Sequence, residues 1–195
     1  MSGNKFFIEY LVRQPVHIDQ YDGAIRLPNG AAILSALTQE ELRVNPAFAS
    51  ARSQDYGTLP WIHYRFLGGQ VDGKDLHVGI CFYDQLLVNV TLSANLYPPG
   101  KWDWSHYSLD VEAETKRFHD RWLEKQFDPP SKSSKLPKGS LSEGQATLEQ
   151  PIYWKFPWGI VSSGHDFKGG GTNILVSYGD RQEKANYAYL ARKVD

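Results

Sequence analysis

A glycine-rich segment over 164–172 is the part of the chain that most resembles a phosphate-binding loop. A P-loop needs a glycine, four residues and then Gly-Lys-Ser/Thr at the start of a helix, so that backbone amides face the phosphate. Here Gly169 is followed by Gly170 instead of lysine, and the next residues favour a strand. We therefore predict a hairpin turn, in which glycine accepts positive φ, and no nucleotide cofactor.

His165 and Asp166 are adjacent and have the residue types of a catalytic acid–base dyad. Neighbouring residues in an extended chain point to opposite sides, so these two side chains cannot orient each other without a turn between them. No Gly-x-Ser-x-Gly nucleophile elbow precedes them. We predict a turn formed by the aspartate and the glycines, an exposed polar His165 and no catalytic residue here.

Cys81 is the single cysteine and lies in an apolar run typical of a buried strand. A nucleophilic cysteine needs an electropositive, partly exposed setting that lowers the pKa of its thiol, and an apolar strand provides the opposite. We predict a buried structural thiol.

The six histidines contain neither His-x-His nor His-x-x-x-His spacing. His63 and His77 flank a predicted hairpin, and they approach each other only in one strand register. On a predicted long helix, Glu112, Lys116 and His119 share a face, but the lysine would repel a metal ion. The spacing therefore predicts no metal site.

The segment 97–107 carries two tryptophans and two tyrosines in a proline-stiffened connection. Tryptophan and tyrosine dominate binding hot spots because they bury much area at low entropic cost. The alternative is that these rings cover the start of the following helix as part of the core. A second, weaker aromatic group follows at 153–158. The predicted partner-binding residues are Trp102, Asp103, Trp104, Tyr107, Tyr153 and Trp158.

Alternating apolar and polar residues predict several short strands along the chain. Asp72-Gly73 between two such runs is the strongest local hairpin signal. The predicted strands cover 6–12, 16–18, 24–27, 61–67, 76–83, 86–92, 152–156, 160–163 and 173–178.

Four segments favour helix: 31–37, 38–44, 108–127 and 181–192. Thr38 with Glu41 forms a capping box sequence, and Asn45-Pro46 should end or bend that helix. In the third helix we expect an exposed Glu112–Lys116 pair. A proline- and serine-rich stretch over 128–145 predicts a flexible surface loop.

Hairpin-linked strands separated by helices indicate an α+β fold. We expect a mainly antiparallel sheet of hairpins with one long helix and two or three shorter ones. The 195 residues are enough for one core, so a single domain over 1–195 is expected.

The formal net charge is −1, so the chain lacks the basic excess of a dedicated nucleic-acid binder. Glu9 and Arg13 interrupt the apolar residues near the N-terminus, which favours a strand over a signal peptide. No run approaches the roughly 18 apolar residues of a membrane helix. Together with the single cysteine, these features predict a cytoplasmic protein that contacts neither nucleic acid nor membrane.

The pattern Phe156-Pro157-Trp158-Gly159-x-Val161-x-Ser163-Gly164-x-Asp166, followed by Ile174-x-Val176-x-Tyr178, resembles bacterial polymorphic-toxin and type VI effector immunity proteins. The resemblance implies a non-enzymatic protein that binds a cognate toxin or effector and occludes its active site. Immunity proteins share no catalytic motif, so no contact residue is transferred.

Two other classes stay open. One is a small hydrolase that combines His63 or His165 with Asp103 or Asp166, for which two titratable groups must meet in a concave pocket. The other is a ligand-binding module that uses Trp102 and Trp104 as a stacking platform. Oligomeric state is left open.

Overall fold

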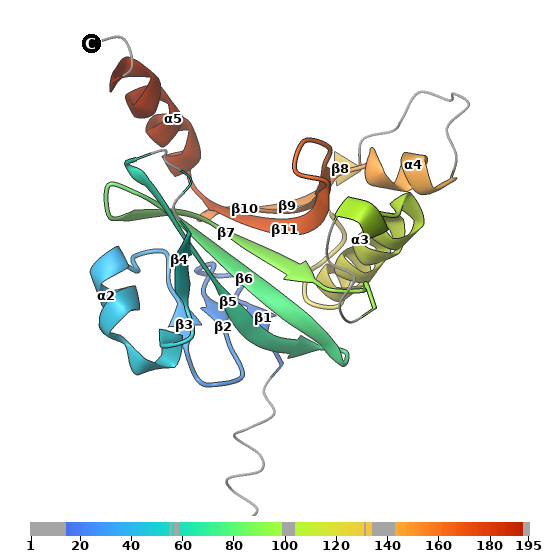
Figure 1. Cartoon of the computed structure of the whole chain (residues 1–195), viewed down its shortest axis with the longest axis horizontal. Coiled ribbons are helices and arrows are strands. Elements are labelled where there is room, and N and C mark those ends of the chain that lie inside the picture. Colours follow the sequence, from blue (N-terminus) through green and yellow to red (C-terminus); the bar gives the residue numbers. More distant parts are fainter. Residues whose placement is uncertain are drawn as a thin grey trace, which may run out of the picture.

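The computed structural model describes residues 15–54, 56, 59–98, 104–130, 132–133 and 143–192. It confirms the α+β class (Figure 1). The elements in chain order are β1 (His17–Ile18), β2 (Ile25–Arg26), β3 (Ala32–Ile33), α2 (Gln39–Val44), the 3-10 helix η1 (Pro46–Phe48), β4 (Arg52–Gln54), β5 (Trp61–Val71), β6 (Lys74–Tyr83), β7 (Leu86–Ala94), η2 (Trp104–His106), α3 (Leu109–Glu124), β8 (Lys132–Ser133), α4 (Glu143–Leu148), β9 (Ile152–Phe156), β10 (Gly159–Asp166), β11 (Gly171–Tyr178) and α5 (Arg181–Arg192).

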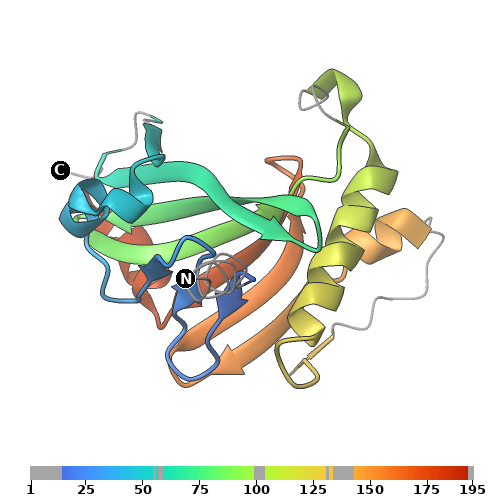
Figure 2. The same cartoon turned by 90° about the horizontal axis from the view of Figure 1, so that it is seen from below.

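The strands form two antiparallel sheets. The small sheet has the order β1-β2-β3, and the large one has the order β4-β5-β6-β7-β11-β10-β9-β8. Viewed from below, the small sheet lies against one face of the large sheet, and α3 runs along its side (Figure 2). The buried side chains of β1–β3, α2 and α3 join those of the large sheet in one core cluster. We call this side of the large sheet the core face.

Two of the predicted local signals are confirmed in detail. Asp72 and Gly73 both adopt positive φ and connect the paired residues Val71 and Lys74, as in a two-residue type I′ hairpin. At the start of α2, the Thr38 side chain accepts from Glu41 N, and the Glu41 carboxylate accepts from Thr38 N. Both capping-box bonds are therefore present.

The helix predicted over 31–37 is wrong. Ala32–Ile33 is instead the strand β3, paired with β2. Ile33 is fully buried in the core cluster, so tertiary burial of a β-branched side chain outweighs the helical preference of its neighbours.

Other predictions fall partly or wholly outside the described residues. The strand predicted over 6–12 lies outside them, as does most of the loop predicted over 128–145. Of the residues in that stretch that the structure describes, Lys132–Ser133 form β8 and the last three belong to the start of α4.

The predicted exposed Glu112–Lys116 pair is also wrong. Both side chains are buried under α3, and Lys116 Nζ pairs instead with Asp120 Oδ2 at 2.7 Å. The helix start is as expected, with the Ser108 hydroxyl accepting from Val111 N at the N-cap.

Candidate functional site

The face of the large sheet opposite the core carries mostly polar side chains, with a few leucines and an isoleucine among them, and is largely uncovered. In Figure 1 no described element crosses it between α5 and the β10–β11 turn. Its side chains alternate with fully buried ones along each strand, as on the half-buried β7 and β11. We call this surface the open face; its central residues are His63, Arg65, Leu67, His77, Gly79, Cys81, Asn89, Thr91, Ser93, Asn173, Leu175 and Ser177.

Helix α5 covers only one end of the open face. Ala185 packs against Tyr83 and Val88, and Tyr189 lies edge-on to Trp61. Arg181, at the start of the helix, donates to the carbonyls of Ser35 and Leu87. These contacts hold the helix so that its polar side chains stand at the rim of the uncovered surface.

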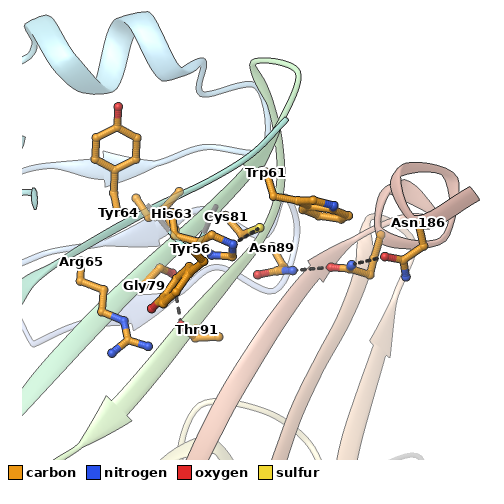
Figure 3. A pocket seen from close by; sticks show the side chains of 12 residues that line it. Tyr56, Trp61, His63, Tyr64, Arg65, Gly79, Cys81, Asn89, Thr91 and Asn186 are labelled. Carbon is orange, nitrogen blue, oxygen red and sulfur yellow. Dashed lines mark hydrogen bonds between the residues drawn. The ribbon is translucent and has the colours of Figure 1, made fainter. Parts of the chain in front are cut away.

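Between α5 and strands β5–β7 the open face contains a cavity of about 390 Å³, which we call the first hollow. Figure 3 shows Trp61 and Tyr56 as aromatic parts of its wall, while Tyr64 points away from it. On the helix side, Asn89 Nδ2 donates to Gln182 Oε1, and Gln182 Nε2 donates to Asn186 Oδ1. The wall therefore offers flat aromatic surface together with amide hydrogen-bonding groups.

His63 and Cys81 meet in this hollow. They are cross-strand partners, and Cys81 Sγ lies 4.0 Å from His63 Nε2. Burial raises the pKa of the Cys81 thiol to about 12. Burial, and next the positive charge of Arg65, lower the pKa of His63. At neutral pH the pair is a protonated thiol beside a neutral imidazole, which does not suit nucleophilic catalysis. The prediction of a buried Cys81 is confirmed.

A second hollow of about 280 Å³ continues the open face toward the β10–β11 turn. It shares Arg65, Gly79 and Thr91 with the first hollow. Its far wall includes Asp166, whose pKa is lowered first by hydrogen bonds from the backbone amides of its own turn. The two hollows therefore form one groove with Arg65 at its centre.

His165 is not exposed as predicted, because its side chain is only 1% accessible. It lies on the core face of β10, where α3 and the segment before it cover the strand. Asp166, its neighbour, points away into the turn, which confirms that the two do not form a pair oriented as acid and base. The acid that His165 meets is Glu112, whose Oε2 lies 3.6 Å from His165 Nδ1.

A buried polar cluster surrounds this contact. Tyr107 OH lies 3.3 Å from His165 Nε2, Thr172 Oγ1 lies 3.1 Å from Nδ1, and Tyr97 donates to Glu112 Oε1. Burial lowers the pKa of His165, against the opposing charge of Glu112, and raises the pKa of Tyr97 to about 12. The cluster is thus a network of tyrosine, threonine and histidine side chains around the carboxyl group of Glu112. Neither hollow of the open face is lined by it.

The structure separates the predicted partner-binding residues. Trp102, Asp103 and the side chain of Trp104 lie outside the described residues. Tyr107 belongs to the buried cluster. Tyr153 is half-buried on the side of β9 that continues the open face, as the register partner of Ser162.

Trp158 lies on the opposite side from Tyr153 and packs with the core. Its ring stacks on Phe156 at 5.1 Å, and its Nε1 donates to Gln20 O at 2.9 Å. The ring also fills the space beside Gly23, where an added Cβ would approach it to 2.6 Å. The second predicted aromatic group is therefore divided between two faces of the sheet.

Sequence reasoning missed the open face as a site, although its signal was present. Asn89 and Thr91 alternate with buried Val88, Val90 and Leu92, which marks one polar side of a strand. His63 and His77 do not pair with each other. In the β5–β6 register His63 is opposite Cys81, and His77 is opposite Leu67. No group of three or more potential metal ligands occurs in the part of the chain that the structure describes.

None of the helices among these described ranges is long and apolar enough to span a membrane. In comparisons with known proteins, the chain matches no family model, and no curated protein or solved structure is significantly similar to it.

Proposed function

We propose that this chain is a non-enzymatic binding protein of the immunity type, which holds a toxin or effector protein on its open face. The observation that carries the proposal is the uncovered groove itself. A sheet face that is polar, hollowed and bordered by a helix provides a firm surface with many hydrogen-bonding groups.

The chemistry of the groove favours binding over catalysis. Its thiol is held protonated, and its histidines are neutral at pH 7, because burial lowers the pKa of both His63 and His77. What the groove offers instead is a cation, amides, hydroxyls and an aromatic wall. Interfaces commonly combine such aromatic anchors with polar complementarity.

The rigidity of the surface supports the same function. The open face belongs to strands whose other side is fully buried, with Val78, Ile80, Val90 and Leu92 at 0–1% exposure. Binding by a preformed surface loses little conformational entropy. A small loss of conformational entropy on binding favours the high affinity that an inhibitor of a toxin needs.

Co-expression with the products of the two flanking genes tests the proposal. We expect one product to be toxic alone, and to be bound and neutralised by the chain. The variant Thr91→Arg places a long side chain at the point that both hollows share, and should abolish protection. The matched control is Glu124→Arg. Glu124 is exposed at the last residue of α3, a helix that packs on the other face of the sheet, so this variant should protect like the unmodified chain.

If neither flanking product is toxic, or a toxic one is not bound, the proposed function is wrong. Equal protection by Thr91→Arg and the control would show that the open face is not the contact surface.

A further inference from the structure

Arg65 lies in an unusual cross-strand row on the open face. Its register partner on β4 is Arg52, and on the other side it pairs with Gly79, which in turn pairs with Thr91. Like charges directly opposite each other on neighbouring strands destabilise a sheet. The row therefore places two cations side by side at a cost to stability.

Neither arginine is neutralised by an acidic side chain in the described part of the chain. Arg52 Nη1 turns back to the carbonyls of Ala49 and Ala51. Arg65 is exposed and forms no ion pair there. Its guanidinium is thus the available charge at the centre of the groove.

Two acids on or beside the groove make hydrogen bonds with neutral groups and no ion pair with Arg65. Asp166 accepts from Lys168 N within its own turn, and Asp75 accepts from Gln70 Nε2. Burial is the main cause that lowers the pKa of His63 and of His77, and the charge of Arg65 lowers both further; at His77 the charge of Asp75 opposes it. Among the described residues Arg65 therefore has no ion-pair partner of its own, although Asp166 lines the same hollow.

Gly79 makes this centre accessible. It lies beside Arg65 in the register, and a Cβ there would approach Thr91 Oγ1 to 2.3 Å. Because Gly79 has no side chain, the space above the backbone beside the Arg65 guanidinium is free in both hollows. A guanidinium binds a carboxylate through two parallel hydrogen bonds, and this geometry needs such lateral space.

We propose that Arg65 receives an acidic side chain, Asp or Glu, from the protein partner, and that the partner's contact segment is therefore acidic. The inference rests on the proposed function, because it names the chemistry of the partner that the open face binds. The carboxylate sits over Gly79 and pairs with the guanidinium, while the groove's hydroxyl and amide groups contact the backbone beside it.

The test uses the full chain and a defined probe, so that it does not depend on finding the partner. Backbone and arginine Nε–H NMR signals are followed during titration with capped hexaglutamate. Capped hexalysine, hexathymidylate, and sodium acetate at the same carboxylate concentration are the comparison ligands. We expect hexaglutamate alone to shift the signals of Arg65, Gly79 and Thr91 in a saturable way.

Arg65→Gln should weaken hexaglutamate binding by about tenfold, as expected for loss of a charge-assisted hydrogen bond. The matched control is Arg43→Gln, on the exposed face of α2 and away from the groove, which should bind like the unmodified chain. The unbound spectra of both variants establish that each is folded.

Three results would overturn the inference: no saturable shift with hexaglutamate, an equal response to hexalysine or acetate, or unchanged binding by Arg65→Gln. Tighter binding of hexathymidylate than of hexaglutamate would also overturn it, in favour of a nucleic-acid partner. If hexaglutamate binds at Arg65 but no flanking gene product does, the immunity function fails and the acidic-ligand assignment stands.

Discussion

His119 should make the protein sensitive to acid. Its side chain is fully buried under α3, and its Nε2 accepts a hydrogen bond of 2.9 Å from Ala94 N. Because Nε2 is the acceptor, the ring proton lies on Nδ1, which has no partner among the described residues. Protonation would turn the acceptor into a donor and break the bond to β7.

Burial, and next the nearby Lys116 cation, lower the pKa of His119 from 6.5 to about 3. The folded state therefore takes up this proton far less readily than the unfolded chain does. The stability that the neutral ring contributes is complete above pH 6.5 and is lost as pH falls from there towards 3. Between pH 7 and pH 4.5, at 1.36 kcal/mol per pH unit, the loss from this residue is about 2.5 kcal/mol.

Urea unfolding at pH 7 and pH 4.5 measures this loss. Other groups also titrate in this range, so the informative quantity is the difference between the chain and His119→Gln. The glutamine can still accept from Ala94 N but does not titrate. The variant should be less stable at pH 7, by about 1–2 kcal/mol for imperfect packing. Its further loss on acidification should be smaller than that of the parent by about 2–3 kcal/mol. An equal acid-induced loss in both proteins would refute the assignment.

Three further outcomes follow from contacts elsewhere. Cys81, with the pKa of its thiol near 12, should react with iodoacetamide at pH 7.5 about a thousandfold more slowly than a thiol of pKa 9.0; a rate near that of free cysteine would contradict the burial. Gly79→Ala should destabilise the chain by about 1–3 kcal/mol in urea unfolding, since its Cβ meets Thr91 Oγ1, and Thr91→Ala in the same chain should restore part of the loss. Gly23→Ala should cost about 2 kcal/mol or more, because Gly23 has φ +74° and lies against the Trp158 ring; a thermal midpoint within a degree of the parent would argue against that packing.

Local signals in the sequence were sufficient where the determining contacts are close along the chain. The Asp72-Gly73 hairpin and the Thr38 capping box depend on residues at most three positions apart, and both form as predicted. The C-terminal helix over 181–192 likewise has the bounds expected from its pattern. Such elements can be predicted from the local sequence, because the turn dihedrals and the capping hydrogen bonds involve only residues within one turn of backbone.

The failures occur where burial depends on distant segments. Ile33 is a strand residue because β2 and the core cover it, and His165 is buried because α3 crosses the end of β10. Glu112 and Lys116 have helical spacing suited to a surface pair, yet the helix turns that face toward the sheet. The spacing of residues along a helix predicts which of them share a face. Whether that face is buried or exposed to solvent depends on how the helix packs.

The same distinction applies to the candidate site. By itself the sequence determined the α+β class, the alternation that makes one side of β7 polar, and the buried state of Cys81. Only the tertiary structure decided that β5, β6, β7 and β11 lie side by side with their polar sides uncovered, and that Arg65 lies at the centre of their groove. The physical reason is that strand order and register depend on pairings between residues far apart in the chain, whose energies no local pattern contains.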